Sequence, residues 1–151
     1  MKLSAKGIYA LRVLSYLAAN HGDRPVSLAQ LARLQNLPPK YLEQIVAILK
    51  NRGLLVSVRG KNGGYSLRRP PEQITLGDVI RAVDGPLAPI PCASRTAPHD
   101  DPDCPFPVDV CWLRAIMVRV RDAVSEILDH ETLAGVAKEA QSQSKAYLHG
   151  G

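Results

Sequence analysis

The sequence predicts a mainly α-helical fold with one β-hairpin and a long helix toward the C-terminus. Three observations predict it. Apolar residues recur every three to four positions in most segments, two short strand-like runs flank a glycine-rich turn at residues 59–64, and an apolar repeat close to seven residues follows Cys111. The chain has 151 residues, which fits a single domain by the usual size of roughly 100–200 residues.

The segment from Pro38 to Arg52 is predicted to be an amphipathic helix with an unusually informative polar face. Proline suits the first helical positions, where a backbone N–H would have no intrahelical partner. Four apolar residues spaced i, i+3, i+4, i+7 form the buried stripe: Leu42, Ile45, Val46 and Leu49. The other face carries hydrogen-bonding side chains of the kind that read base edges. The candidates there are Lys40, Tyr41, Glu43 and Gln44.

A β-hairpin is predicted directly after this helix. Residues 54–58 and 65–68 read as strands, and the turn between them contains three glycines and two cations. Glycine lets a backbone approach phosphate closely, and arginine suits a narrow minor groove. Arg59, Gly60 and Lys61 are therefore candidate DNA contacts. With a short helix at 27–35, begun by Ser27, residues 1–70 are predicted to form a winged helix-turn-helix DNA-binding region.

Charge divides the chain in the same place. Residues 1–70 hold twelve Lys and Arg against two acidic residues, and residues 71–151 hold seven against twelve. Phosphate binding is largely electrostatic, so a concentrated positive charge favours a nucleic-acid partner. A merely solvated basic face, or a winged-helix protein-interaction module that binds no DNA, is the alternative.

The rest of the chain is predicted to connect and pair the DNA-binding regions. Residues 71–110 contain a short helix that starts at Thr75 and a proline-rich loop from 86 to 107, and residues 111–140 form a long dimerisation helix and a short C-terminal helix. Packing of the long helix on the first helix of the same chain is the alternative. Residues 141–151 are expected to form a flexible tail.

Three cysteines lie in or just after the proline-rich loop: Cys92, Cys104 and Cys111. In a chain without export features they do not read as a disulfide framework. Cysteine thiolates are the usual ligands of iron–sulfur clusters, and a helix-poor loop can wrap a cluster. A thiol redox switch between Cys104 and Cys111, a zinc site and the absence of any cofactor stay open.

The chain resembles the bacterial winged-helix regulators typified by IscR, with NsrR and RirA as relatives. The resemblance rests on residues 39–45, 49–55 and 58–67, and it includes the start of the chain at 1–11. It implies a homodimeric transcription factor, often with an iron–sulfur cluster, and it identifies the three cysteines as cluster ligands. A [2Fe-2S] centre is preferred and a [4Fe-4S] centre stays open.

The ligand pattern departs from that family at three points. The intervals between the cysteines are uneven, with eleven and six residues between them. The position that carries a ligating histidine in IscR-like proteins is Arg114 here, and position 8, where NsrR-like proteins use an acidic residue, is Ile8. The candidates for a fourth ligand are then His99, an aspartate of the loop or a small molecule.

The predicted function is a homodimeric transcription regulator that binds a palindromic operator in double-stranded DNA and is modulated by the cluster. Cluster supply, oxidation and nitric oxide are all possible signals, and the sequence does not choose between repressor and activator. A cluster-free thiol switch of the same fold is the alternative. No enzyme is predicted, because the glycine-rich turn lacks the order of a nucleotide loop and the histidines have no nucleophile context. Nothing reads as an export signal or a membrane span, so the cytoplasm is expected.

Overall fold

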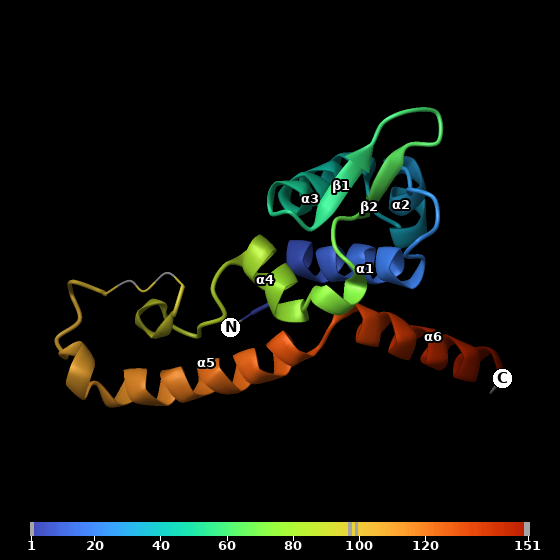
Figure 1. The fold of residues 1–151 in the computed structure, drawn as a ribbon. Helices are drawn as coiled ribbons and strands as arrows, with labels where there is room; N and C mark the ends of the chain where they lie inside the picture. The colour runs from blue at the N-terminus through green and yellow to red at the C-terminus, as the bar shows by residue number, and fades with distance from the viewer. Residues whose placement is uncertain (1, 97, 99, 150–151) are drawn as a thin grey trace.

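The computed structural model describes residues 2–96, 98 and 100–149, with residues 145–149 described by their backbone alone (Figure 1). Within these residues the chain forms six α-helices, one two-stranded antiparallel sheet and three short 3-10 turns. The mainly helical fold class predicted from the sequence is confirmed.

The first three helices form the helix-turn-helix and its support. Helix α1 spans Ala5–Ala19, α2 spans Leu28–Gln35 and α3 spans Pro39–Asn51. The hydroxyls of Ser4 and Ser27 accept backbone N–H groups at the starts of α1 and α2, which satisfies donors that lack an intrahelical partner. The apolar stripe predicted on α3 is fully buried.

The hairpin pairs β1, Leu55–Val58, with β2, Gly64–Leu67. Strand β2 also contacts the link between α1 and α2: Tyr65 and Val26 exchange two backbone hydrogen bonds of 2.8 and 3.0 Å. The start of β2, next to the turn, is therefore fixed to the link between α1 and α2, while the turn itself projects beyond it (Figure 1).

Helix α4, Leu76–Asp84, begins with a reciprocal capping box between Thr75 and Asp78. Helix α5 spans Trp112–His130 and α6 spans Leu133–His149. Helix α4 packs on α1, α3 and α5, and α6 packs on α1. In Figure 1, α5 and the loop that precedes it extend to one side of the DNA-binding region, and α6 runs to the other.

The C-terminal segment differs from the sequence prediction. The sequence predicts a short final helix and a loose tail at residues 141–151, but α6 continues to His149, and residues 150 and 151 lie outside the described residues. The first turns of α6 are held in place because Leu133 and Ala137 are buried in the core beside α1. The polar composition beyond residue 140 did not indicate this continuation.

Buried residues of α1, α3, the hairpin, α4 and α6 form one core, with α1 at its centre. Helix α5 has no buried residue. No helix among the described residues is both long and apolar enough to cross a membrane.

Candidate functional site

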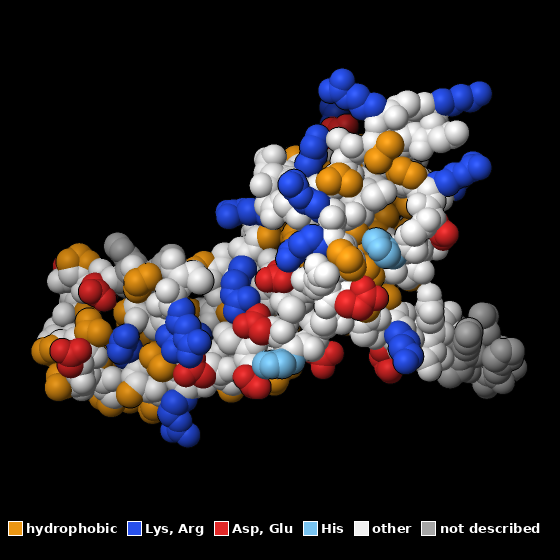
Figure 2. Space-filling view, viewed as in Figure 1, with side chains coloured by type: hydrophobic (Ala, Val, Ile, Leu, Met, Phe, Trp, Pro, Cys, Tyr) orange, Lys and Arg blue, Asp and Glu red, His pale blue; other side chains and the backbone are white. Residues whose placement is uncertain are grey.

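The polar face of α3 points into solvent. Lys40, Glu43 and Gln44 are exposed, opposite the buried stripe that holds the helix on α1 and α4. Most Lys and Arg side chains in Figure 2 project from the part of the molecule that contains α2, α3 and the hairpin, and the acidic side chains gather mainly over α4 to α6. The charge division seen in the sequence is thus also a division in space.

Tyr41 lies differently from the other candidates on α3. It is half-buried, and its ring meets the ring of Tyr9 edge to face at 5.9 Å between centroids. The guanidinium of Arg12 lies 5.4 Å from the Tyr9 ring centroid and donates to the side chain and backbone of Gln35. Tyr41 therefore joins α3 to α1, and its remaining exposed edge is what can face a ligand.

The hairpin turn presents Arg59, Gly60 and Lys61, all exposed. Gly64 comes so close to the link between α1 and α2 that an added Cβ would lie 2.4 Å from the Val26 carbonyl group. Glycine is needed at this position for close approach, in addition to its positive φ of 154°.

An open groove of about 610 Å³ lies between the hairpin turn and the link from α1 to α2. Its polar lining includes Arg24, Ser27, Gln30, Lys61 and Asn62. Sequence reasoning assigned only Lys61 of these to the interface. Arg24 precedes the start of α2 by four residues, and its place beside the turn depends on the contact of Val26 with Tyr65, which no local pattern indicates.

All three cysteines border one cavity of about 440 Å³, which we call the thiol pocket. Apolar side chains form part of its wall, and Asp100, Asp101 and Arg114 also line it. A volume in this range suits a group larger than a single ion. The structure thus brings Cys92, Cys104 and Cys111, which the sequence predicts to belong to one site, to the border of the same cavity.

The three sulfur atoms are free thiols, of which that of Cys104 is exposed and the other two are half-buried. Thiols are the donors that iron–sulfur clusters use, so the chemistry of this donor set suits such a group, but the spacing of the three sulfur atoms in this structure does not. Among the described residues, no three His, Cys, Asp or Glu side chains converge closely enough to hold a metal ion. His99, the predicted fourth ligand, lies outside the described residues.

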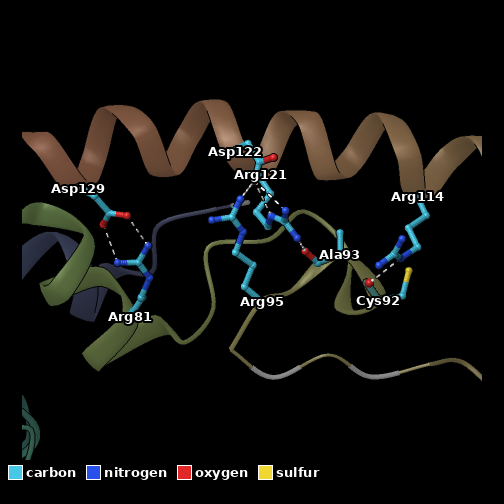
Figure 3. Close-up of polar contacts among 8 residues, drawn as sticks. All are labelled: Arg81, Cys92, Ala93, Arg95, Arg114, Arg121, Asp122 and Asp129. Atoms are coloured by element: carbon cyan, nitrogen blue, oxygen red, sulfur yellow. Dashed lines mark hydrogen bonds and ion pairs between the residues drawn. The ribbon is translucent and has the colours of Figure 1, made fainter. Parts of the chain in front are cut away.

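Two arginines of α5 hold the 3-10 turn at Pro91–Ala93, which carries Cys92. Arg114 Nε donates to the Cys92 carbonyl at 3.1 Å, and Arg121 Nη1 donates to the Ala93 carbonyl at 2.6 Å (Figure 3). Neither contact was predicted, because the sequence marks Arg114 as a departure from a ligand position and gives no reason to pair Arg121 with the turn.

Helix α5 is joined to α4 by a two-pronged ion pair. Arg81 donates to both carboxylate oxygens of Asp129 at 2.6 and 2.8 Å. The hydrogen bond to Asp129 and the attraction between the charges raise the pKa of Arg81, and the same contact lowers the pKa of Asp129. The pair is thus charged at any pH near neutrality and connects the helix after the thiol pocket to the core.

The outer face of α5 is apolar and exposed. It carries Trp112, Leu113, Ile116, Val120 and Ile127. This is the seam that the sequence predicted for dimerisation. The alternative was that α5 packs on α1 of the same chain. In the structure α6, α4 and α3 pack on α1 instead, and the seam is exposed.

Comparison with known proteins agrees with this geometry. The chain is similar to CymR of Bacillus subtilis, an HTH-type transcriptional regulator, with 39% identity over 148 residues that cover 98% of each chain. Its fold is similar to the solved structure of that protein, described as the global cysteine regulator, with a TM-score of 0.74, 40% identity and coverage of 92% of this chain and 98% of that one. IscR of T. potens is similar at a TM-score of 0.71 and 35% identity, with coverage of 93% and 88%.

These relatives are named as transcriptional regulators and not as enzymes, in agreement with the sequence prediction. The model of the Rrf2 family, described as an iron-dependent transcriptional regulator, matches residues 3–139. The chain belongs to the Rrf2 family of winged-helix transcriptional regulators.

Proposed function

We propose that the protein is a homodimeric regulator whose affinity for a palindromic operator is set by the state of the thiol pocket. The observation that carries the proposal is the place of this pocket: its third cysteine, Cys111, is the residue directly before α5. Any group that binds or oxidises the three thiols acts at the start of the helix that bears the exposed apolar seam. We place this activity in the cytoplasm, where operators are.

The DNA contacts follow from the two exposed elements of the basic region. Helix α3 enters the major groove with Lys40, Glu43 and Gln44, and the exposed edge of Tyr41 adds to this face. Arg59, Gly60 and Lys61 of the hairpin turn reach the adjacent minor groove and backbone. The groove with Arg24 adds a phosphate contact beside Lys61.

Two copies pair through the outer face of α5. Ile127 is 63% exposed and Trp112 is 66% exposed, and a seam of this kind on a 19-residue helix is stabilised when a second apolar surface covers it. A two-fold dimer presents two α3 helices to two half-sites, which is why the operator is expected to be palindromic.

Cys92, Cys104 and Cys111 would hold an iron–sulfur cluster in the thiol pocket, with a [2Fe-2S] centre preferred. When bound, the cluster is the chemical group that responds to oxidation, to iron supply and to nitric oxide. The protein's own contribution is to place three thiols along one partly apolar cavity. The description of the family as iron-dependent supports the choice of an iron-containing group.

A cluster-free thiol switch is the second candidate. The exposed thiol of Cys104 shares the pocket with Cys111, and it is accessible to oxidants. The similarity to a protein described as a cysteine regulator favours sulfur chemistry of this kind. Both candidates use the same pocket and differ in whether iron is present.

Anaerobic purification followed by an absorption spectrum and assays of iron and sulfide separates the two candidates. The cluster hypothesis predicts a coloured protein whose iron and sulfide are lost in Cys104→Ala. A colourless, iron-free wild-type protein that acquires a disulfide on mild oxidation contradicts the cluster and supports the thiol switch. A mobility shift with duplex DNA at low and high salt tests DNA binding itself in either case.

A further inference from the structure

The 3-10 turn that carries Cys92 is held on α5 through its main chain. Arg114 and Arg121 lie seven residues apart, which is two helical turns, so both side chains leave the same face of α5. One guanidinium binds the carbonyl of Cys92 and the other that of Ala93 (Figure 3). We call these two hydrogen bonds the carbonyl clamp.

The strength of the carbonyl clamp depends on the orientation of the peptide groups in the turn. A hydrogen bond from a charged guanidinium to a carbonyl is strong and depends on direction, so a small rotation of the Cys92 peptide weakens it. The Arg121 side chain is only 11% exposed. Its Nε and Nη2 atoms donate to Asp122 at 2.9 and 2.7 Å, which fixes the guanidinium plane before it meets the turn.

The loop side of the clamp is fixed as well. Arg95, which follows the turn by two residues, donates to the same Asp122 oxygen at 2.7 Å. Asp122 therefore connects the arginine of α5 with the arginine of the loop, and these hydrogen bonds lower its pKa. The carboxylate stays ionised near neutral pH, and the clamp is not disturbed by ordinary changes of pH.

The other end of α5 leads to the DNA-binding region. Asp129, eight residues after Arg121, binds Arg81 of α4, and α4 packs on both α1 and α3. Gly77 allows this close contact, because an added Cβ there would lie 2.0 Å from a carboxylate oxygen of Asp129. A continuous set of contacts thus runs from the thiol pocket through the clamp and α5 to the recognition helix.

We propose that Arg114 and Arg121 are positioning residues that couple the thiol pocket to DNA affinity by holding the backbone of the Cys92 turn on α5. This inference rests on the proposed function. A group bound to the Cys92 thiol moves or restrains that backbone, the clamp transmits the change to α5, and α5 transmits it through Arg81 and Asp129 to α4. Arg114 has two contacts in this coupling, because it lines the thiol pocket as well as binding the Cys92 carbonyl.

The test compares operator affinity in two states of the full chain. The duplex is one that the protein selects from a random library. Protein reduced by a phosphine is compared with protein whose thiols have been blocked by N-ethylmaleimide, which forms a thioether with cysteine. The chain has three cysteines and all three border the pocket, so the reagent acts there. Fluorescence anisotropy gives the ratio of the two dissociation constants, which is the coupling.

We expect a wild-type ratio of at least about fivefold in either direction, the lower end of usual coupling factors. In Arg121→Gln the ratio falls to within about twofold, and in the double variant Arg114→Gln/Arg121→Gln it approaches one. Arg119→Gln, which removes an exposed charge from a different face of α5, keeps the wild-type ratio. Sedimentation of every variant checks that the dimer is preserved.

Hydrogen exchange supplies a measurement that does not depend on DNA. The amides of Ala93 and Ser94 donate within the turn, so loss of the clamp should speed their exchange in Arg121→Gln and not in Arg119→Gln. A wild-type ratio of one overturns the proposed function and this inference together. A responsive wild type whose clamp variants respond equally, with unchanged exchange in the turn, overturns the inference alone.

Discussion

At the residue scale, single side chains at the tip of the hairpin are expected to determine DNA affinity. Arg59 and Lys61 are both exposed. The turn is open to solvent at Gly60, between them, because no atom lies within 4 Å of a Cβ built there. Cations held out in this way can enter a minor groove without displacing any contact of the folded protein.

Replacement of Arg59 by alanine should weaken operator binding by about 1–3 kcal/mol and leave the fold unchanged. The reason is that the side chain reaches the minor groove in the proposed complex and, being exposed, takes no part in the core. Titration of labelled duplex measures the effect, with Arg119→Ala as the control on α5. Equal affinity of Arg59→Ala and wild type would remove this residue from the interface.

The sequence predicted the chemistry of single residues well where the pattern is local. The cap at Ser27, the stripe of α3 and the hairpin turn depend on neighbours within a few positions, and they were confirmed. The half-buried state of Tyr41 was not predicted, because its partner Tyr9 lies on another helix.

At the element scale, two contacts decide how the hairpin and α5 are held. The hairpin is fixed by the pairing of Val26 with Tyr65, and α5 is fixed to α4 by Arg81 and Asp129. Sequence patterns gave the elements themselves and their approximate bounds. They could not give these contacts, since each joins segments far apart in the chain, nor could they show that α6 extends to His149.

Substitution of Gly64 by alanine should lower the free energy of unfolding by about 1–3 kcal/mol, the usual effect of forcing extra volume into a packed contact. The added methyl group would meet the Val26 backbone at 2.4 Å. Gly22→Ala is a matched control, because Gly22 also has positive φ but has nothing within 4 Å. Urea unfolding of both variants separates the effect of the close contact from that of backbone strain. Equal losses of unfolding free energy in the two variants would contradict the role given to Val26.

Acid should weaken the attachment of α5 to α4. The pKa of Asp129 is lowered in the folded protein, so its contact with Arg81 stabilises the fold above the unfolded-state value of about 3.9 and is lost as pH falls through the lower folded-state value. Urea midpoints measured from pH 6 to pH 3 should fall less steeply in Asp129→Asn than in wild type. Asp23→Asn, at an exposed site, should follow the wild type. Parallel curves for all three proteins would contradict this account.

At the scale of the whole molecule, most Lys and Arg side chains project from the half that contains α2, α3 and the hairpin (Figure 2), and the other half carries the exposed seam and the thiol pocket. The charge count of the sequence predicted the basic half. The carbonyl clamp could not be predicted, because a backbone carbonyl as acceptor leaves no signature in side-chain sequence.

Introduction of a charge into the seam should separate the subunits. Ile116→Asp places a carboxylate in the middle of the outer face of α5, where burial against a second copy would be costly. Analytical ultracentrifugation should show a shift toward monomer at micromolar concentration. Ala115→Asp, one position away on the helix and off the seam, should stay dimeric, and a dimer of unchanged affinity in Ile116→Asp would exclude this face.

The most direct test of the central claim is the operator affinity of anaerobically purified wild-type protein compared with a variant in which all three pocket cysteines are replaced by serine. If the pocket sets DNA affinity, the two dissociation constants differ by at least about fivefold while the dimer and the helical content stay the same. Equal affinity of the two proteins, or no binding to any duplex at low salt, would contradict the account.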